Sequence, residues 1–136
     1  MTIYVVDTNV LVSGLLSSQG PCAIIVQHIL NGQLSLAFDK RIVDEYREVL
    51  SRTQFGFKQE DIDSLIAAMR LDGQEIYAFP LQISLPDCDD LMFIEVAKAA
   101  EASIITRNSK HFPGISHVLT PREFLETFSS EGPMLS

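Results

Sequence analysis

The stretch Ile3-Tyr4-Val5-Val6-Asp7-Thr8-Asn9 indicates where the central sheet begins and where its chemistry lies. Its apolar residues are β-branched or aromatic, which is typical of a buried strand. The run ends at Asp7, and ligands of open α/β sheets bind outside the carboxyl ends of the strands. Two roles for Asp7 follow from this position, a functional carboxylate or a cap of the next helix, and both stay open at this point.

Length and composition predict one soluble domain. The chain has 136 residues, of which 46% are hydrophobic and 21% charged, as is usual for globular proteins. It contains no apolar run of the roughly 20 residues that cross a bilayer and no secretion signal, so we expect a cytoplasmic protein without membrane contact. Cys22 and Cys88 lie far apart and in no metal-binding spacing, which fits a reducing compartment. We predict a single domain over residues 1–128 and a flexible tail over residues 129–136.

The net charge of −8, from 18 acidic and 10 basic residues, argues against non-specific binding of nucleic acid, which depends on Lys and Arg. That objection weakens if some of the acids hold divalent cations, because the ions then supply positive charge locally. Net charge therefore leaves the class of partner open.

Strands alternate with helices along the rest of the chain. We predict further strands at residues 34–38, 75–79, 103–106 and 117–119, and helices at residues 10–16, 21–30, 41–51, 59–71 and 92–100 and from residue 121. This alternation is typical of an α/β fold with a parallel sheet and helices on both faces.

Glu45 has an unusual place on the predicted helix 41–51. The apolar stripe of that helix consists of Ile42, Val43, Tyr46, Val49 and Leu50. Glu45 lies at the rim of the stripe, where a carboxylate is partly desolvated and can face a cleft. A plain boundary residue is the alternative, and base rates favour it.

A second acidic feature, Asp87-Cys88-Asp89-Asp90, comes directly before the helix at 92–100. Capping and the helix dipole account for one or two of these acids. Asp90 borders the apolar face formed by Phe93, Val96 and Ala97, as Glu45 borders its own stripe.

The predicted topology brings distant polar residues to one edge of the sheet. Asp7, Glu45 and Asp90 follow the first three strands, and Asn108 follows the strand at 103–106. Carboxylates about 4 Å apart repel by roughly 4 kcal/mol at an effective dielectric near 20. A hard divalent cation, Mg²⁺ or Mn²⁺, would relieve that repulsion. No grouping of His or Cys in the sequence suggests zinc.

These residues belong to blocks that, in order along the chain, resemble PIN domains. The blocks are Val5-Val6-Asp7-Thr8-Asn9-Val10-Leu11-Val12, Asp44-Glu45-Tyr46 with Val49-Leu50-Ser51-Arg52, Pro86-Asp87-Cys88-Asp89-Asp90 with Phe93, and Ile105-Thr106-Arg107-Asn108 with His111-Phe112-Pro113. The closing Leu119-Thr120-Pro121-Arg122-Glu123-Phe124-Leu125 is similar to the branch that holds toxin components of VapBC-type toxin-antitoxin systems.

The resemblance implies a three-layer α/β/α fold with strand order 3-2-1-4-5 and a metal-dependent endoribonuclease. By position, Asp7, Glu45 and Asp90 match the family's metal-binding acids, and Thr8, Asn9 and Thr106 match supporting polar residues. Mg²⁺ or Mn²⁺ held there would activate a water for phosphodiester cleavage. RNA is the implied substrate, and a small antitoxin protein and a homodimer or higher oligomer are candidate partners.

One departure from the family pattern concerns Asn108, which stands where many PIN domains have a fourth acid. An amide is a neutral and weaker ligand, so binding of a second metal ion is in question. Asp87 and Asp89 are candidates to compensate, and Cys88 fits a spacer better than a ligand of a hard ion.

Several basic residues lie near the predicted edge and are candidates to hold an RNA backbone. They are Lys40, Arg41, Arg47, Arg107 and Lys110. His111 has two interpretations, a proton shuttle or a turn residue that packs beside Phe112, and the second is the more common.

Two other classes of protein compete with a nuclease. A receiver-like phospho-accepting domain could use Asp87, but no Lys directly follows the later strands, and a haloacid dehalogenase phosphatase would need a second Asp where Asn9 stands. The other alternative is a catalytically weak or inactive PIN-fold binding protein, for which Asn108 is the best support.

Overall fold

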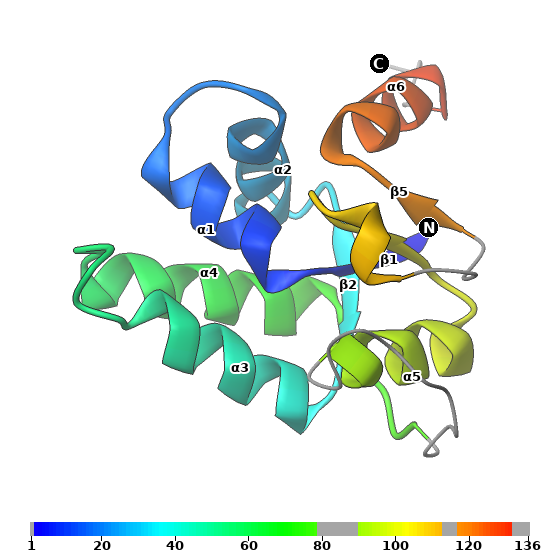
Figure 1. Ribbon diagram of the computed structural model, residues 1–136, viewed down its shortest axis with the longest axis horizontal. Helices are drawn as coiled ribbons and strands as arrows, with labels where there is room; N and C mark the ends of the chain where they lie inside the picture. The colour runs from blue at the N-terminus through cyan, green and yellow to red at the C-terminus, as the bar shows by residue number, and fades with distance from the viewer. Residues whose placement is uncertain (1, 79–89, 113–116, 132–136) are drawn as a thin grey trace.

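The computed structural model describes residues 2–78, 90–112 and 117–131, and these form a five-stranded sheet flanked by helices (Figure 1). The strands are β1 Ile3–Val6, β2 Ser35–Phe38, β3 Gln74–Glu75, β4 Ser103–Ile105 and β5 Val118–Leu119. Their order is β3-β2-β1-β4-β5, and every neighbouring pair is parallel. This confirms the predicted α/β class and strand order. Receiver domains have the order 2-1-3-4-5, so the receiver-like alternative is wrong.

The helices are α1 Thr8–Leu16, α2 Pro21–Leu30, α3 Lys40–Leu50, α4 Gln59–Asp72, α5 Leu91–Ala100 and α6 Pro121–Glu131, with a 3₁₀ turn, η2, at Ser109–His111. Helix α5 packs across β1, β2 and β4, whereas α2 contacts α1, α4 and α6 away from α5 (Figure 1). Within the described ranges no single helix is long and apolar enough to cross a membrane, although α1 and α2, bent by 99°, pass that test as a pair.

Local sequence patterns account for most of these elements. Helix α3 begins where the Asp39 side chain accepts a hydrogen bond from the backbone N–H of Ile42, a standard N-cap. All five residues of its predicted apolar stripe are buried. One of them, Tyr46, also donates a hydrogen bond from its hydroxyl to the Val6 carbonyl at the end of β1. The stripe thereby fixes α3, and with it Glu45, against the carboxyl end of the central strand.

The predicted strand at 75–79 begins one residue earlier, at Gln74, and residues 76–78 are not part of it, while residue 79 lies outside the described residues. Strand β3 pairs Gln74 with Ala37 and Glu75 with Phe38, and Ile76 donates one more backbone hydrogen bond to the Phe38 carbonyl. Strand β2 ends at Phe38 because Asp39 already caps α3. The partner strand therefore ends before a longer β3 could pair with it. At the carboxyl end of the chain, α6 extends to Glu131, and the domain boundary at residue 129 stays a prediction.

Candidate functional site

Asp7 lies where β1 meets α1, and the residue is 5% exposed. It occupies the N-cap position of α1, but the carboxylate makes no capping hydrogen bond. Its Oδ2 atom instead accepts a hydrogen bond from Thr106 Oγ1 at 2.7 Å. Thr106 follows β4, the neighbour of β1 in the sheet. Helix capping therefore does not explain this acid, which leaves the interpretation of Asp7 as a functional carboxylate.

Burial raises the pKa of the Asp7 carboxyl above its ordinary value. The Thr106 hydrogen bond and the nearby His111 oppose that rise. The backbone N–H groups of Thr8 and Asn9 oppose it as well, without reaching capping geometry. Desolvation outweighs these groups, so a negative charge on Asp7 is only partly compensated by the protein itself.

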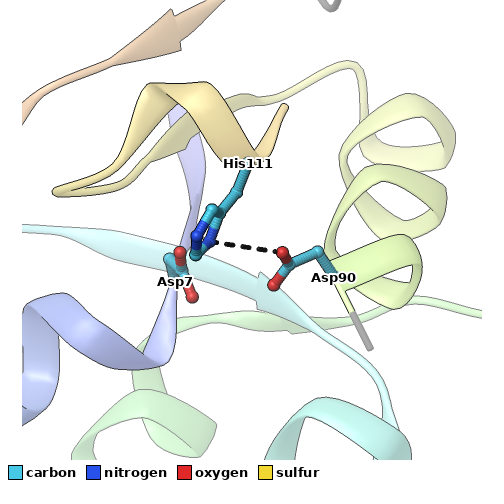
Figure 2. A group of neighbouring side chains, drawn as sticks. All are labelled: Asp7, Asp90 and His111. Carbon is cyan, nitrogen blue, oxygen red and sulfur yellow. Dashed lines mark ion pairs between the residues drawn. The ribbon is translucent and has the colours of Figure 1, made fainter. Parts of the chain in front are cut away.

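Asp90 and His111 lie beside Asp7, and the three side chains point toward one another (Figure 2). One ligand atom from each lies within 4.8 Å of the other two. Asp90 comes directly before α5 and is 8% exposed, and its Oδ2 atom is 3.4 Å from Nδ1 of His111. The residues therefore place two carboxylates and one imidazole around a common point. His111 is more than a turn residue packed beside Phe112, which was the more common interpretation of the sequence.

Asn108 contacts the imidazole of this cluster. Its side-chain Nδ2 lies 2.9 Å from His111 Nε2, and its backbone N–H donates to Thr106 Oγ1 at 3.1 Å. If Nδ2 donates to Nε2, the ring proton is on Nδ1 and faces Asp90. The residue at the family's fourth acidic position thus orients His111. Both residues belong to one turn that includes η2, and the spacing from 108 to 111 was the available sequence signal for this contact.

Glu45 reaches the site from α3 and is half-buried, as its place at the rim of the stripe predicted. Thr8 Oγ1 donates a hydrogen bond to Glu45 Oε2 at 3.3 Å. Glu45 is outside the group of three residues whose ligand atoms lie within 4.8 Å of one another. It lines the same cavity as Asp7 and Asp90. The structure therefore brings Asp7 and Asp90 together and places Glu45 on the adjoining wall.

The remaining supporting residues connect β4 to α1. Asn9 Oδ1 accepts a hydrogen bond from the backbone N–H of Arg107 at 3.2 Å, and the Arg107 guanidinium donates to Ser13 Oγ at 2.6 Å. Together with the Thr106–Asp7 bond, these contacts hold the ends of two neighbouring strands in register. Of the three polar residues matched through the resemblance, Asn9 and Thr106 take part in this frame, and Thr8 bonds Glu45 instead.

A cavity of about 490 Å³ opens over the acidic cluster. Its lining residues come from the end of β1 and from α1, from α3 and the turn after it, from the residue before α5, and from the loop and 3₁₀ turn after β4. They include the acidic and imidazole groups of Asp7, Glu45, Asp90 and His111, together with Arg52, Phe55 and Arg107. Asp87, Cys88 and Asp89 lie outside the described residues.

The other predicted RNA-binding cations lie apart from this cavity. Lys40 pairs with Asp44 at 2.8 Å, and Arg47 approaches Asp63 on α4 at 3.8 Å. Lys110 is exposed on η2. Of the five candidates, only Arg107 is among the residues that line the acidic cavity, and RNA contacts of the other four stay predictions.

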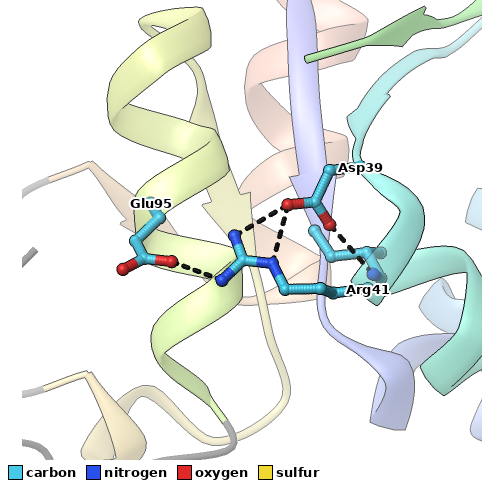
Figure 3. Close-up of polar contacts among 4 residues, drawn as sticks. Asp39, Arg41 and Glu95 are labelled. Atoms are coloured by element: carbon cyan, nitrogen blue, oxygen red, sulfur yellow. Dashed lines mark hydrogen bonds and ion pairs between the residues drawn. The ribbon is translucent and has the colours of Figure 1, made fainter. Parts of the chain in front are cut away.

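Arg41 takes part in a network that the sequence analysis did not anticipate. Its guanidinium donates to Asp39 at 2.7 and 2.9 Å and to Glu95 on α5 at 2.6 Å (Figure 3). The Glu95 side chain is only 3% exposed, and a buried carboxylate requires a partner. The bond therefore joins the start of α3, the helix that carries Glu45, to α5, the helix that follows Asp90.

Replacing Arg41 with Gln is expected to lower the free energy of unfolding by about 1.5 kcal/mol. Removing one partner of a buried ion pair usually costs about 3–5 kcal/mol, and we reduce that figure because 49% of the Arg41 side chain is exposed. Urea unfolding would measure the change. Lys40→Gln, which removes the neighbouring exposed pair with Asp44, is the matched control and should unfold like the wild type. An Arg41→Gln/Glu95→Gln double variant should recover stability, and equal losses in the double and single variants would contradict this account.

Comparison with known proteins gives one match. A family model described as PIN domain matches residues 4–110, a range that includes Asp7, Glu45, Asp90 and Asn108. No curated protein and no solved structure matches the chain significantly.

Proposed function

This chain belongs to the PIN domain family, and from that premise we propose that it is a metal-dependent endoribonuclease. The observation that supports the proposal most strongly is the group of Asp7, Asp90 and His111, with ligand atoms within 4.8 Å of one another at the carboxyl end of the sheet.

The donor atoms of this group suit a divalent cation. Two buried carboxylates offer oxygen ligands of the kind that Mg²⁺ and Mn²⁺ prefer, and burial raises the pKa of Asp7, so a nearby positive ion would stabilise its charged form. The imidazole adds a nitrogen donor, which transition-metal ions accept more readily than Mg²⁺ does. We therefore expect Mn²⁺ to be bound more tightly than Mg²⁺, with Asp7, Asp90 and His111 as ligands and Glu45 contributing from the cavity wall.

When bound, such an ion would polarise the phosphodiester and lower the pKa of a coordinated water. The chain's own residues set the geometry for that chemistry. Thr106 fixes the orientation of the Asp7 carboxylate, and Asn108 holds the ring of His111 with Nδ1 toward Asp90. With the amide of Asn108 donating to Nε2, Nδ1 holds a proton beside Asp90. Binding of an ion by Nδ1 would move the ring proton to Nε2 and turn the amide of Asn108 so that its Oδ1 accepts that proton. Arg107, anchored by Ser13, is placed to bind a phosphate next to the acids.

The finer parts of the proposal rest on the resemblance of the sequence blocks. The closing block at residues 119–125 favours the toxin branch, with RNA as the substrate and a small antitoxin protein as the partner. A homodimer or higher oligomer is part of the same proposal.

A catalytically weak binding protein is the second candidate, and Asn108 favours it. The amide stands where a fourth acid would add a charged ligand, and it contacts His111 instead, so the group of Asp7, Asp90 and His111 gains no further negative charge from this position. This candidate predicts RNA binding without cleavage.

Incubation of the protein with RNA in Mn²⁺, with and without a chelator, separates the two candidates. We expect cleavage in Mn²⁺, weaker cleavage in Mg²⁺ and none in the presence of the chelator. Intact RNA in Mn²⁺ together with retained RNA binding would favour the second candidate.

A further inference from the structure

Besides Arg107, the cavity over the acids contains an aromatic ring, Phe55, and a second guanidinium group, Arg52, which have no role in the proposed metal chemistry. We propose that Phe55, Arg52 and Arg107 form a subsite that binds one nucleotide of single-stranded RNA beside the acids. This inference rests on the proposed function and deepens it by naming the residues that would hold one base and its phosphate. All three side chains line the cavity of about 490 Å³ that contains Asp7 and Asp90, a volume in the usual range for small-ligand sites.

Phe55 has the surroundings of a fixed stacking platform. The turn after α3 brings it back toward the helix, since its backbone N–H donates to the Arg52 carbonyl at 3.1 Å. Its ring stacks on Phe57, with centroids 5.5 Å apart and planes 15° apart, and Phe57 packs against the core. Gly56 between them has φ +67, a conformation that favours glycine. The Phe57 ring and the turn thus hold Phe55 in the cavity wall. Phe55 is only half-buried, so packing in the core does not explain an aromatic residue at this position.

The cavity also contains two guanidinium groups among its four carboxylates, which are those of Asp7, Glu45, Glu48 and Asp90. Arg107 is held by Ser13, and Arg52 is held by Glu48 on α3 at 2.8 and 2.9 Å. Guanidinium groups bind phosphate through paired N–H donors. In a protein with a net charge of −8, two such groups in the cavity of the acids mark where a phosphate backbone can approach.

Stacking on Phe55 requires an unpaired base. Bases in an A-form duplex are already stacked on each other, and proteins recognise such duplexes through the sugar and phosphate groups. An aromatic platform beside phosphate-binding groups is instead the arrangement that binds single strands with little sequence preference. The subsite therefore predicts that unpaired RNA binds and duplex RNA of the same sequence binds poorly.

The test measures binding apart from cleavage, by fluorescence anisotropy of a short labelled single-stranded RNA on protein that also carries Asp7→Asn. Adding Phe55→Leu should weaken binding by roughly 5- to 150-fold, the range for loss of one base–aromatic stack. Phe55→Trp should restore affinity, because a larger ring stacks at least as well. Arg52→Gln should weaken binding and reduce the slope of log affinity against log salt by about 1. Tyr77→Leu is the control, since Tyr77 is 86% exposed and lines a different cavity, and should bind like the parent.

Equal affinities of the Phe55→Leu and Phe55→Trp proteins would overturn the subsite, as would duplex RNA that binds as tightly as the single strand. Thermal unfolding of each variant identifies any loss of affinity that comes from loss of fold. RNA cleavage that depends on Asp7, with no effect of Phe55 on affinity, would remove the subsite and leave the nuclease in place. Loss of affinity in Phe55→Leu and rescue by Trp, without cleavage by the wild type, would support the subsite and remove the nuclease.

Discussion

Asp7→Asn is expected to lower the rate of Mn²⁺-dependent RNA cleavage by about 1,000-fold while the protein stays folded. A metal ion stabilises the charge of such a transition state by several kcal/mol, and each 1.36 kcal/mol is about a factor of ten in rate. Asn keeps the shape of Asp7 and can still accept the Thr106 hydrogen bond, but it offers the ion no charge. Without metal the variant should be at least as stable as the wild type at neutral pH, because it removes a carboxylate whose pKa is raised by burial.

Asp44→Asn is the matched control for that experiment. Like Asp7→Asn, this substitution removes one negative charge. Asp44 lies on α3 next to Glu45, and its side chain is 59% exposed and pairs with Lys40. Its cleavage rate should equal that of the wild type. Equal cleavage by wild type and Asp7→Asn would assign the activity to a contaminating nuclease. A marked fall in melting temperature of metal-free Asp7→Asn would contradict the account of Asp7 as a destabilised carboxylate.

Local periodicity was enough to predict the elements that position the acids. The run before Asp7 is β1, Pro21 and Asn31-Gly32 mark the bounds of α2, and the stripe of α3 is buried as its spacing required. These features depend on residues that are neighbours in the sequence. The strand order came from the resemblance of ordered blocks, because periodicity alone does not specify which strands are adjacent.

Features that depend on partners distant in sequence could not be predicted in this way. The length of β3 is set by where β2 ends, and the burial of Glu95 is tolerated because Arg41 reaches it from another helix. The orientation of the His111 ring also depends on a residue distant in the sequence. The position of His111 in a turn gave no sign that the end of β4 would direct the ring toward Asp90. Phe55 lies between the predicted helices at 41–51 and 59–71, and its place in the acidic cavity depends on how the turn folds back after α3.

Mn²⁺ at about 100 times its dissociation constant is expected to raise the free energy of unfolding by about 2.7 kcal/mol, the linkage value for a ligand that binds only the folded state. The increment should depend on pH through Asp7. Because its folded-state pKa is raised, the stabilising contribution of Asp7 is fully present below its ordinary value of 3.8 and is lost as the pH rises through the raised pKa. Above the raised pKa the metal-free protein therefore has a charged, desolvated carboxylate, which the ion stabilises.

Lowering the pH toward the raised pKa should shrink the Mn²⁺ increment, because protons then compete with the ion for Asp7. Denaturant unfolding with and without Mn²⁺, at about pH 7 and about pH 5, measures both effects. Asp7→Asn should show almost no increment at either pH. An increment that is unchanged in Asp7→Asn would place the ion elsewhere, and one that grows as the pH falls would mean that the ion is not bound by a carboxylate with a raised pKa.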